Sequence, residues 1–168
     1  RARGIPVVLG GIHPSMCPEE AGQHADAVVL GEADRLWPDL VQDFAHGRMK
    51  SRYHDPEPVD LAQITLPRRD LLDPKGYVIF NAVQTTRGCP FNCNFCSVTT
   101  MSGVKYRFRP VEKVIEEVKA LDNRFIYFVD DNIIGVPRRA KELFKAFAPL
   151  KLGWASQVTI NFARDQEL

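Results

Sequence analysis

Short apolar runs alternate with helix-like segments along this chain of 168 residues. In the first half, residues 5–11 (IPVVLGG) and 26–32 (DAVVLGE) have the composition of buried strands. Residues 18–25 and 33–47 have the apolar spacing of helices. Because strands joined by helices pair in parallel through right-handed crossovers, this half predicts the end of an α/β sheet.

The second half repeats the alternation. Strands are predicted at residues 78–86, 124–130 and 152–160, and helices at residues 110–121 and 137–147. A proline opens each of these helices, at the position where its missing N–H costs least. Ligands of parallel sheets gather at the carboxyl ends of the strands, so we expect the functional residues of this half to follow its strands.

A proline-rich segment separates the halves. Residues 48–79 hold four of the chain's twelve prolines and few periodic apolar positions, which predicts a linker or wrapping segment. The predicted domains are accordingly residues 1–47 and 80–168. Because the chain begins at Arg1 without a methionine and opens on a predicted strand, we expect a fragment of a longer protein.

Charge and hydropathy argue against two classes of partner. The chain has 22 Lys and Arg against 21 Asp and Glu, so no global field attracts nucleic acid. The run VKYRFRP at residues 104–110 mixes basic and aromatic residues, but its few cations are followed at once by an acidic helix. No apolar run reaches the roughly 18 residues of a membrane helix, and no signal-peptide pattern begins the chain. We expect a cytoplasmic protein with no membrane span and no nucleic acid partner.

Three of the four cysteines crowd into the sequence RGCPFNCNFC at residues 87–96. With C-x3-C-x2-C spacing, they are Cys89, Cys93 and Cys96. A zinc site takes four protein ligands, or three and a water, but the nearest histidines lie upstream at His46 and His54 and no second C-x2-C pair follows. A ferredoxin-type carrier needs a fourth cysteine, and Cys17 lies in the other half. The remaining interpretation is a 4Fe-4S cluster on three cysteines, with one iron open.

This cysteine spacing, with Gly88 and Pro90 around the first cysteine and Phe95 before the last, resembles the radical S-adenosylmethionine (SAM) superfamily. The resemblance implies that the open iron binds the amino and carboxylate groups of SAM. Reduction of the cluster then cleaves SAM to a 5′-deoxyadenosyl radical. A small-molecule substrate and an electron donor such as flavodoxin or ferredoxin are the partners that the resemblance implies.

Further SAM-binding residues follow from the resemblance where this sequence supplies them. Phe95 matches an aromatic position near the adenine, or it packs within a tight loop. Asp130 and Asp131 end a predicted strand, where the family has a polar motif that receives the amino group of SAM. We expect one of them to face SAM, although an aspartate there also suits a loop or helix cap. Gln157, on the next strand, either reaches the ligand or is a satisfied core residue.

Glycines end both predicted strands of the first half, in VVLGGIHPS and DAVVLGE. A glycine there lets a ligand approach the backbone, although tight turns of any α/β sheet look the same. Ahead of a radical SAM cysteine loop, residues 5–46 resemble the last part of a Rossmann-like cobalamin-binding domain. The cobalamin-binding residues that this resemblance implies are Gly10, Gly11, Gly31 and Glu32. His13, in the same loop, is not assigned as a cobalt ligand.

The expected fold class is α/β: the end of a Rossmann-like parallel sheet, followed by the first βα units of a partial (β/α) radical SAM barrel. The leading function is a cobalamin-dependent methylation or oxidative cyclisation of a small organic or lipid substrate. Two alternatives stay open. One is a radical SAM enzyme without cobalamin, such as an RNA methylthiotransferase, although that class carries further cysteines upstream. The other is a non-catalytic, metal-stapled binding or electron-transfer protein.

Overall fold

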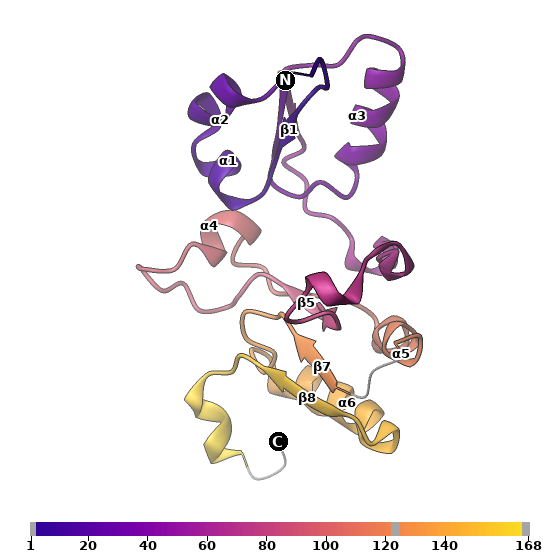
Figure 1. Ribbon diagram of the computed structural model, residues 1–168. Helices are drawn as coiled ribbons and strands as arrows, with labels where there is room; N and C mark the ends of the chain where they lie inside the picture. Colours follow the sequence, from indigo (N-terminus) through magenta and orange to yellow (C-terminus); the bar gives the residue numbers. More distant parts are fainter. Residues whose placement is uncertain (1–2, 122–124, 166–168) are drawn as a thin grey trace. The chain divides into compact units, whose positions relative to one another are not determined.

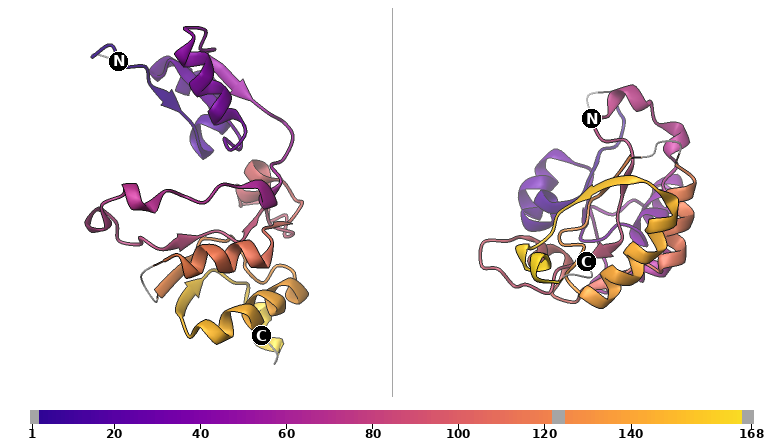
Figure 2. Two further views of the ribbon diagram at one scale, coloured as in Figure 1. Left: turned by 90° about the vertical axis from the view of Figure 1, so that its right-hand side faces the viewer. Right: turned by 90° about the horizontal axis from the view of Figure 1, so that it is seen from below.

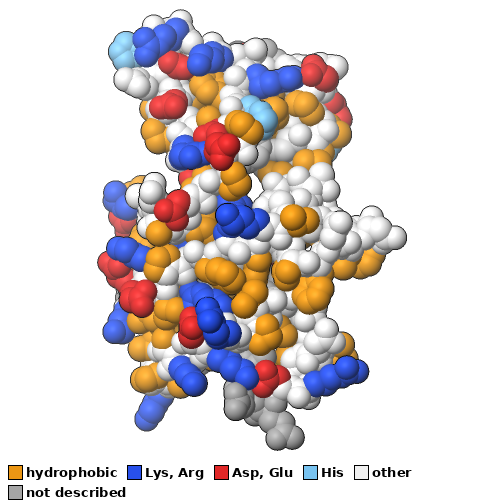
Figure 3. Space-filling model, turned by 180° about the vertical axis from the view of Figure 1, so that it is seen from behind, with side chains coloured by type: hydrophobic (Ala, Val, Ile, Leu, Met, Phe, Trp, Pro, Cys, Tyr) orange, Lys and Arg blue, Asp and Glu red, His pale blue; other side chains and the backbone are white. Residues whose placement is uncertain are grey.

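The computed structural model describes residues 3–121 and 125–165, and the chain divides into two compact units, residues 1–59 and 60–168 (Figure 1). Within the described part of the chain, no helix is long and apolar enough to cross a membrane. Basic, acidic and hydrophobic side chains are interspersed on the face drawn in Figure 3, in keeping with the nearly balanced charge.

The first unit is built on a three-stranded parallel sheet. Its strands, in spatial order, are β1 (Val8–Leu9), β2 (Ala27–Leu30) and β3 (Arg52–His54). The helices that connect them are α1 (Ile12–Met16), α2 (Pro18–His24) and α3 (Leu36–Ala45). The first two helices join β1 to β2, and α3 joins β2 to β3.

The central strand β2 is covered on both faces. Val29 packs in one cluster with Leu40 of α3 and Tyr53 of β3. Val28, the preceding residue, points to the opposite face and packs with Ala21 of α2. A parallel strand covered on both faces has a continuous apolar run, which is why AVVL predicted a buried strand.

The second unit contains a second parallel sheet and a separate antiparallel pair. The sheet has the order β4 (Ala82–Val83), β7 (Phe125–Phe128) and β8 (Gly153–Ser156). Its crossover helices are α5 (Val111–Lys119) and α6 (Pro137–Phe147). The antiparallel pair is β5 (Thr86–Arg87) with β6 (Arg107–Phe108). The connection between these two strands contains α4 (Val98–Ser102).

The core of the second unit lies between this sheet and the two crossover helices. Figures 1 and 2 show α5 and α6 packed together against the sheet. Phe128 of β7 is fully buried there, with Val114 of α5 and Leu143 of α6 in the same cluster. Full burial of a side chain such as Phe128 stabilises the fold by about 1.5–3 kcal/mol.

Five short 3₁₀ helices complete the described chain. They are η1 (Leu61–Gln63), η2 (Arg69–Leu71), η3 (Pro74–Gly76), η4 (Ala148–Leu150) and η5 (Ile160–Arg164). Asp60 and Asp73 begin η1 and η3, and each carboxylate accepts the N–H two residues further on at 3.0 Å. These two caps explain why the chain turns at η1 and at η3 instead of extending.

The predicted α/β class with parallel strands is confirmed, but several elements differ from the prediction. The predicted strand 78–86 is split into β4 and β5, and the predicted strand 152–160 ends at Ser156. Residues 52–54 lie in the segment predicted as a linker, yet they form β3. Residue 124, the first of another predicted strand, lies outside the described residues. The helices α1 and α4 were not predicted, because five residues are too few to show a helical period.

Candidate functional site

The three clustered cysteines lie in the loop that leaves β5. Cys89 and Cys96 are partly exposed, Cys93 is exposed, and none forms a disulfide. Gly88 opens this loop with φ of +86°, and a Cβ there would lie 2.7 Å from the carbonyl oxygen of Lys105. Because only glycine tolerates both the backbone angle and the close approach, Gly88 fixes the point at which the cysteine loop begins.

The sulfur atoms of the cysteine loop are spread more widely than the ligands of a bound zinc ion. A zinc ion with Zn–S bonds of about 2.3 Å would hold its sulfur ligands about 3.8 Å apart. The donor atoms of Cys89, Cys93 and Cys96 do not all lie within 4.8 Å of one another. Three soft thiolates are ligands that iron–sulfur clusters take.

Asp130 is committed to the backbone that leads into the cysteine loop. Its side chain is buried, at 1% exposure. The carboxylate accepts the N–H and the hydroxyl of Thr85, both at 3.0 Å, and the hydroxyl of Thr86. Burial raises the pKa of Asp130, and the threonine donors offset part of that rise. Asp130 therefore ties the end of β7 to the segment between β4 and β5.

Asp131, the next residue, is exposed, and partial desolvation raises its pKa. Gln157 is also exposed and lies one residue beyond the end of β8. Its carbonyl oxygen accepts the N–H of Ile133 at 3.2 Å, so the loops that follow β7 and β8 are joined. Phe95 is 88% exposed within the cysteine loop and does not serve as a packing residue.

Parallel pairing brings these loops to one edge of the sheet. Asp131 and Gln157 follow β7 and β8 at this edge, and the chain that leaves β4 at the same edge runs through β5 into the cysteine loop. A cavity of about 160 Å³ adjoins them, lined by Phe91, Ile134, Gly135, Pro137, Thr159, Asn161 and Phe162. Ligand pockets usually measure about 300–1,000 Å³, so these residues form only part of a site for a molecule as large as SAM.

A buried ion-pair network supports the strand that leads to the cysteines. Glu117 of α5 is 2% exposed, and its two oxygens lie 2.6 Å from Arg69 and 2.6 Å from Arg109. Arg69 also donates to the carbonyl of Ala82 at 2.5 Å, and Arg109 donates to that of Gln84 at 2.7 Å. Arg109 belongs to the basic run VKYRFRP. Its charge is nevertheless buried in the ion pair with Glu117 and is not presented on the surface.

The predicted cobalamin residues lie in two turns of the first unit, after β1 and after β2. Gly11 and Gly31 have φ of +95° and +75°, and nothing lies within 4 Å of the place of a Cβ at either glycine. A Cβ on Gly10 would make only ordinary contact with Val29. The carboxylate of Glu32 accepts the N–H of Val59 at 2.8 Å, which holds the end of the unit. Both turns thus expose backbone that a ligand can approach.

The family model of the Radical SAM superfamily matches residues 83–151, a range that includes the cysteine loop, α5, β7 and α6. Residues 83–151 belong to the Radical SAM superfamily. The resemblance seen in the cysteine spacing is confirmed.

Relatives of this chain match both units. Bacteriochlorophyllide d C-12(1)-methyltransferase of Chlorobaculum tepidum is 32% identical over 178 residues, covering 100% of this chain and 39% of that protein. Hopanoid C-2 methylase of Rhodopseudomonas palustris is 26% identical, covering 98% of this chain and 33% of that protein. The chain therefore spans about a third to two fifths of the length of these relatives.

A solved structure shares the fold of this chain. The radical SAM methyltransferase TsrM from Kitasatospora setae, with cobalamin and a [4Fe-4S] cluster bound, superposes with a TM-score of 0.67 at 17% identity. The match covers 88% of this chain and 34% of TsrM. The fold of the matched part of the chain is thus a known one.

Sequence reasoning missed Tyr106 and Gly135, which shape this edge of the second unit, and did not predict the contacts of Asn132, which ends the same polar run as Asp130 and Asp131. The Tyr106 hydroxyl donates to the carbonyl of Asn132, and burial raises the pKa of Tyr106 to about 12. A Cβ on Gly135 would lie 2.9 Å from the Tyr106 ring and 3.2 Å from Pro90 of the cysteine loop. The side-chain oxygen of Asn132 accepts the N–H of Thr159 at 3.2 Å. These contacts join residues far apart in sequence, so no local pattern indicates them.

Ser15 of α1 was also missed, and it joins the two glycine turns of the first unit. Its hydroxyl donates to the carbonyl of Gly11 at 2.7 Å and accepts the N–H of Gly31 at 2.9 Å. One side chain thereby sets the spacing between the turns. A serine within a short loop gives no signal of this role in the sequence.

Proposed function

We propose that this protein is part of a radical SAM enzyme that methylates an unreactive carbon of a small organic or lipid substrate with the help of cobalamin. The observation that carries the proposal is the loop of three unpaired, partly exposed cysteines after a parallel strand, within residues that belong to the Radical SAM superfamily. The names of both relatives above specify methyl transfer to a numbered position.

The donor set of the cysteine loop fits a 4Fe-4S cluster. Cys89, Cys93 and Cys96 supply three thiolates, which leaves one iron of a cubane cluster for another ligand. When bound, the cluster supplies the electron that cleaves SAM to a 5′-deoxyadenosyl radical, and cobalamin carries the methyl group. The chain's own part is to hold the thiolates, and Gly88 and the Asp130 contacts fix the backbone that presents them.

Asp131 is our candidate for the carboxylate that receives the SAM amino group. The hydrogen bonds of Asp130 are already taken by Thr85 and Thr86, whereas Asp131 is exposed at the same edge. A carboxylate accepts strong, charge-assisted hydrogen bonds from an ammonium group. Phe95, exposed in the cysteine loop, and Gln157, beyond β8, stay proposed as further SAM contacts.

The glycine turns of the first unit offer open backbone that the nucleotide tail of cobalamin can approach. Gly11 and Gly31 leave open backbone after neighbouring strands, and Ser15 keeps the turns together. Gly10 extends this open surface. Glu32 acts through Val59, so we propose that it positions its turn rather than touching cobalamin.

The test uses protein reconstituted under anaerobic conditions with iron, sulfide and a cobalamin. After addition of SAM and a chemical reductant, which replaces a donor such as flavodoxin or ferredoxin, we expect 5′-deoxyadenosine by chromatography. Cobalamin should remain with the protein through gel filtration. Cleavage of SAM without retention of cobalamin would favour a radical SAM enzyme of the RNA methylthiotransferase kind. A protein that holds a cluster but never cleaves SAM would favour an electron-transfer protein.

A further inference from the structure

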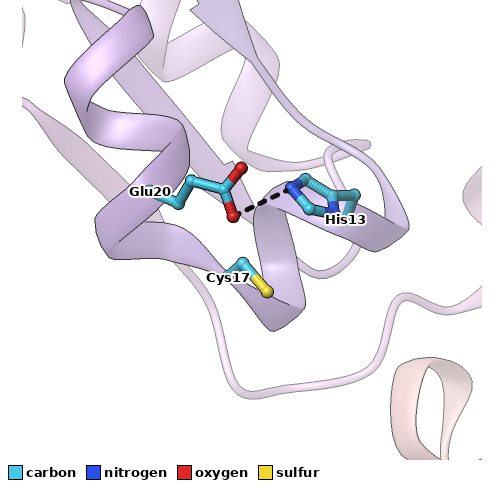
Figure 4. A group of neighbouring side chains, drawn as sticks. All are labelled: His13, Cys17 and Glu20. Atoms are coloured by element: carbon cyan, nitrogen blue, oxygen red, sulfur yellow. Dashed lines mark ion pairs between the residues drawn. The ribbon is translucent and has the colours of Figure 1, made fainter.

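We propose that His13, Cys17 and Glu20 form a binding site for a divalent metal ion, with zinc as the best-suited ion. The three residues each offer one ligand atom, and these atoms all lie within 4.8 Å of one another (Figure 4). Within the described part of the chain, this is the one group of three or more His, Cys, Asp or Glu residues that meets this spacing. The proposal does not depend on the proposed function.

The backbone places the three side chains on one side of the α1–α2 turn. The N–H of Cys17 donates to the carbonyl of His13 at 2.8 Å, and the N–H of Ala21 donates to that of Cys17 at 3.0 Å. Cys17 lies at the junction where α1 ends and α2 begins, four residues after His13 and three before Glu20. The turn between the two helices brings the three ligand atoms together.

The separation of two of the ligands matches zinc. With Zn–N and Zn–O bonds of about 2.0–2.2 Å, a tetrahedral ion holds its nitrogen and oxygen ligands about 3.4 Å apart. Nε2 of His13 and Oε2 of Glu20 are 3.5 Å apart, and their side chains are 66% and 62% exposed. An exposed ion pair contributes little to stability by itself. The Cys17 sulfur lies within 4.8 Å of a ligand atom of His13 and of Glu20, so the third ligand is near the pair.

The donor set also favours zinc over harder ions. Imidazole and thiolate ligands suit zinc, whereas magnesium and calcium prefer oxygen ligands. Three protein ligands leave a fourth position for water. A bound ion would fix α1 against α2, and α1 carries Ser15, which joins the turns at Gly11 and Gly31. The site would therefore stabilise the turn from which both glycines are presented.

The test must separate this site from the cysteine loop. We would replace Cys89, Cys93 and Cys96 with alanine in the full chain and measure zinc binding under reducing conditions by competition with a chromophoric chelator. This background should bind one equivalent of zinc. Even loss of an outer-shell partner weakens metal binding 10–100-fold, so Cys17→Ser, His13→Ala and Glu20→Gln should each weaken it at least about tenfold.

His24→Ala is the matched control, because His24 is an exposed histidine of α2 outside the group. It should leave zinc affinity unchanged. Cobalt(II) should give a thiolate charge-transfer band that disappears with Cys17→Ser. Equal zinc affinity with and without Cys17, or an equal loss with His24→Ala, would overturn the proposal. If the triple-alanine background fails to fold, the zinc content of wild type and Cys17→Ser is compared instead, and a difference of less than one equivalent overturns it.

Discussion

Asp130 and Asp131 stand side by side after β7, and their surroundings give them different tasks. The carboxylate of Asp130 is buried among donors from Thr85 and Thr86, whereas that of Asp131 is exposed. A carboxylate that already accepts three hydrogen bonds has little capacity left for a ligand. Asp130 is therefore a structural residue, and its neighbour Asp131 is a candidate ligand contact.

Replacement of each aspartate with alanine should separate these tasks. Asp130→Ala leaves buried donors of Thr85 and Thr86 unpaired, and each costs about 1–3 kcal/mol, so the free energy of unfolding in urea should fall by at least about 2 kcal/mol. Asp131→Ala should change that stability by less than about 0.5 kcal/mol. It should weaken SAM binding roughly ten- to a hundredfold, measured by calorimetry on reconstituted protein. Unchanged SAM affinity in Asp131→Ala would remove Asp131 from the site.

At the scale of elements, the segment from β4 to β5 is held by side chains of other elements. Arg69 and Arg109 donate to its carbonyls and both pair with Glu117 of α5. Asp130, after β7, holds its other end. Because this segment leads directly into the cysteine loop, the geometry of the thiolates depends on packing at a distance from them.

Glu117→Gln tests this support. The substitution leaves two largely buried guanidinium groups without their counter-charge, which should lower the free energy of unfolding by about 3–5 kcal/mol. The matched control is Glu116→Gln, on the same helix, where an exposed pair with Lys113 contributes at most about 1 kcal/mol. Denaturant unfolding of both variants measures the difference. Equal stability of the two variants would show that the buried network does not support the segment.

The elements that were predicted well from sequence have either a continuous apolar run or several apolar residues at helical spacing. AVVL in β2 and FIYF in β7 are such runs, and α6 has its buried residues at helical spacing. β3 (Arg52–His54) has one buried residue, Tyr53, so no periodicity could reveal it. The pairing of β5 with β6 and the contact of Arg69 with Glu117 join residues far apart in sequence. Such contacts depend on the finished fold, and a local pattern cannot predict them.

At the scale of the whole molecule, each unit has its own core and its own candidate ligand edge. The first unit offers the glycine turns after β1 and β2, and the second offers the cysteine loop and Asp131 after β4 and β7. The cysteines and the alternation of strands and helices were readable from sequence. The roles of Ser15 and Glu32 could not be predicted from sequence, because each role depends on a hydrogen bond to a residue distant in sequence.

Gly11→Val tests the first unit without disturbing the second. A valine side chain would occupy the open space above the Gly11 backbone, so cobalamin retention on gel filtration should be lost while the cluster still assembles. The matched control is Gly47→Val, because Gly47 also has a positive φ of +69° and open space at its Cβ position, but lies after α3. Equal loss of cobalamin in both variants would assign the effect to backbone strain, and retention in Gly11→Val would remove the turn from the site.

The central claim is that Cys89, Cys93 and Cys96 together hold one 4Fe-4S cluster. The most direct measurement is the iron and sulfide content of anaerobically reconstituted protein, with electron paramagnetic resonance of its reduced form. Wild type and Cys17→Ala should each contain about four iron atoms and four sulfides per chain, and Cys89→Ala, Cys93→Ala and Cys96→Ala should each lose the cluster. A reconstituted wild type that holds zinc and no iron, or a cluster that survives all three loop substitutions, would contradict the account.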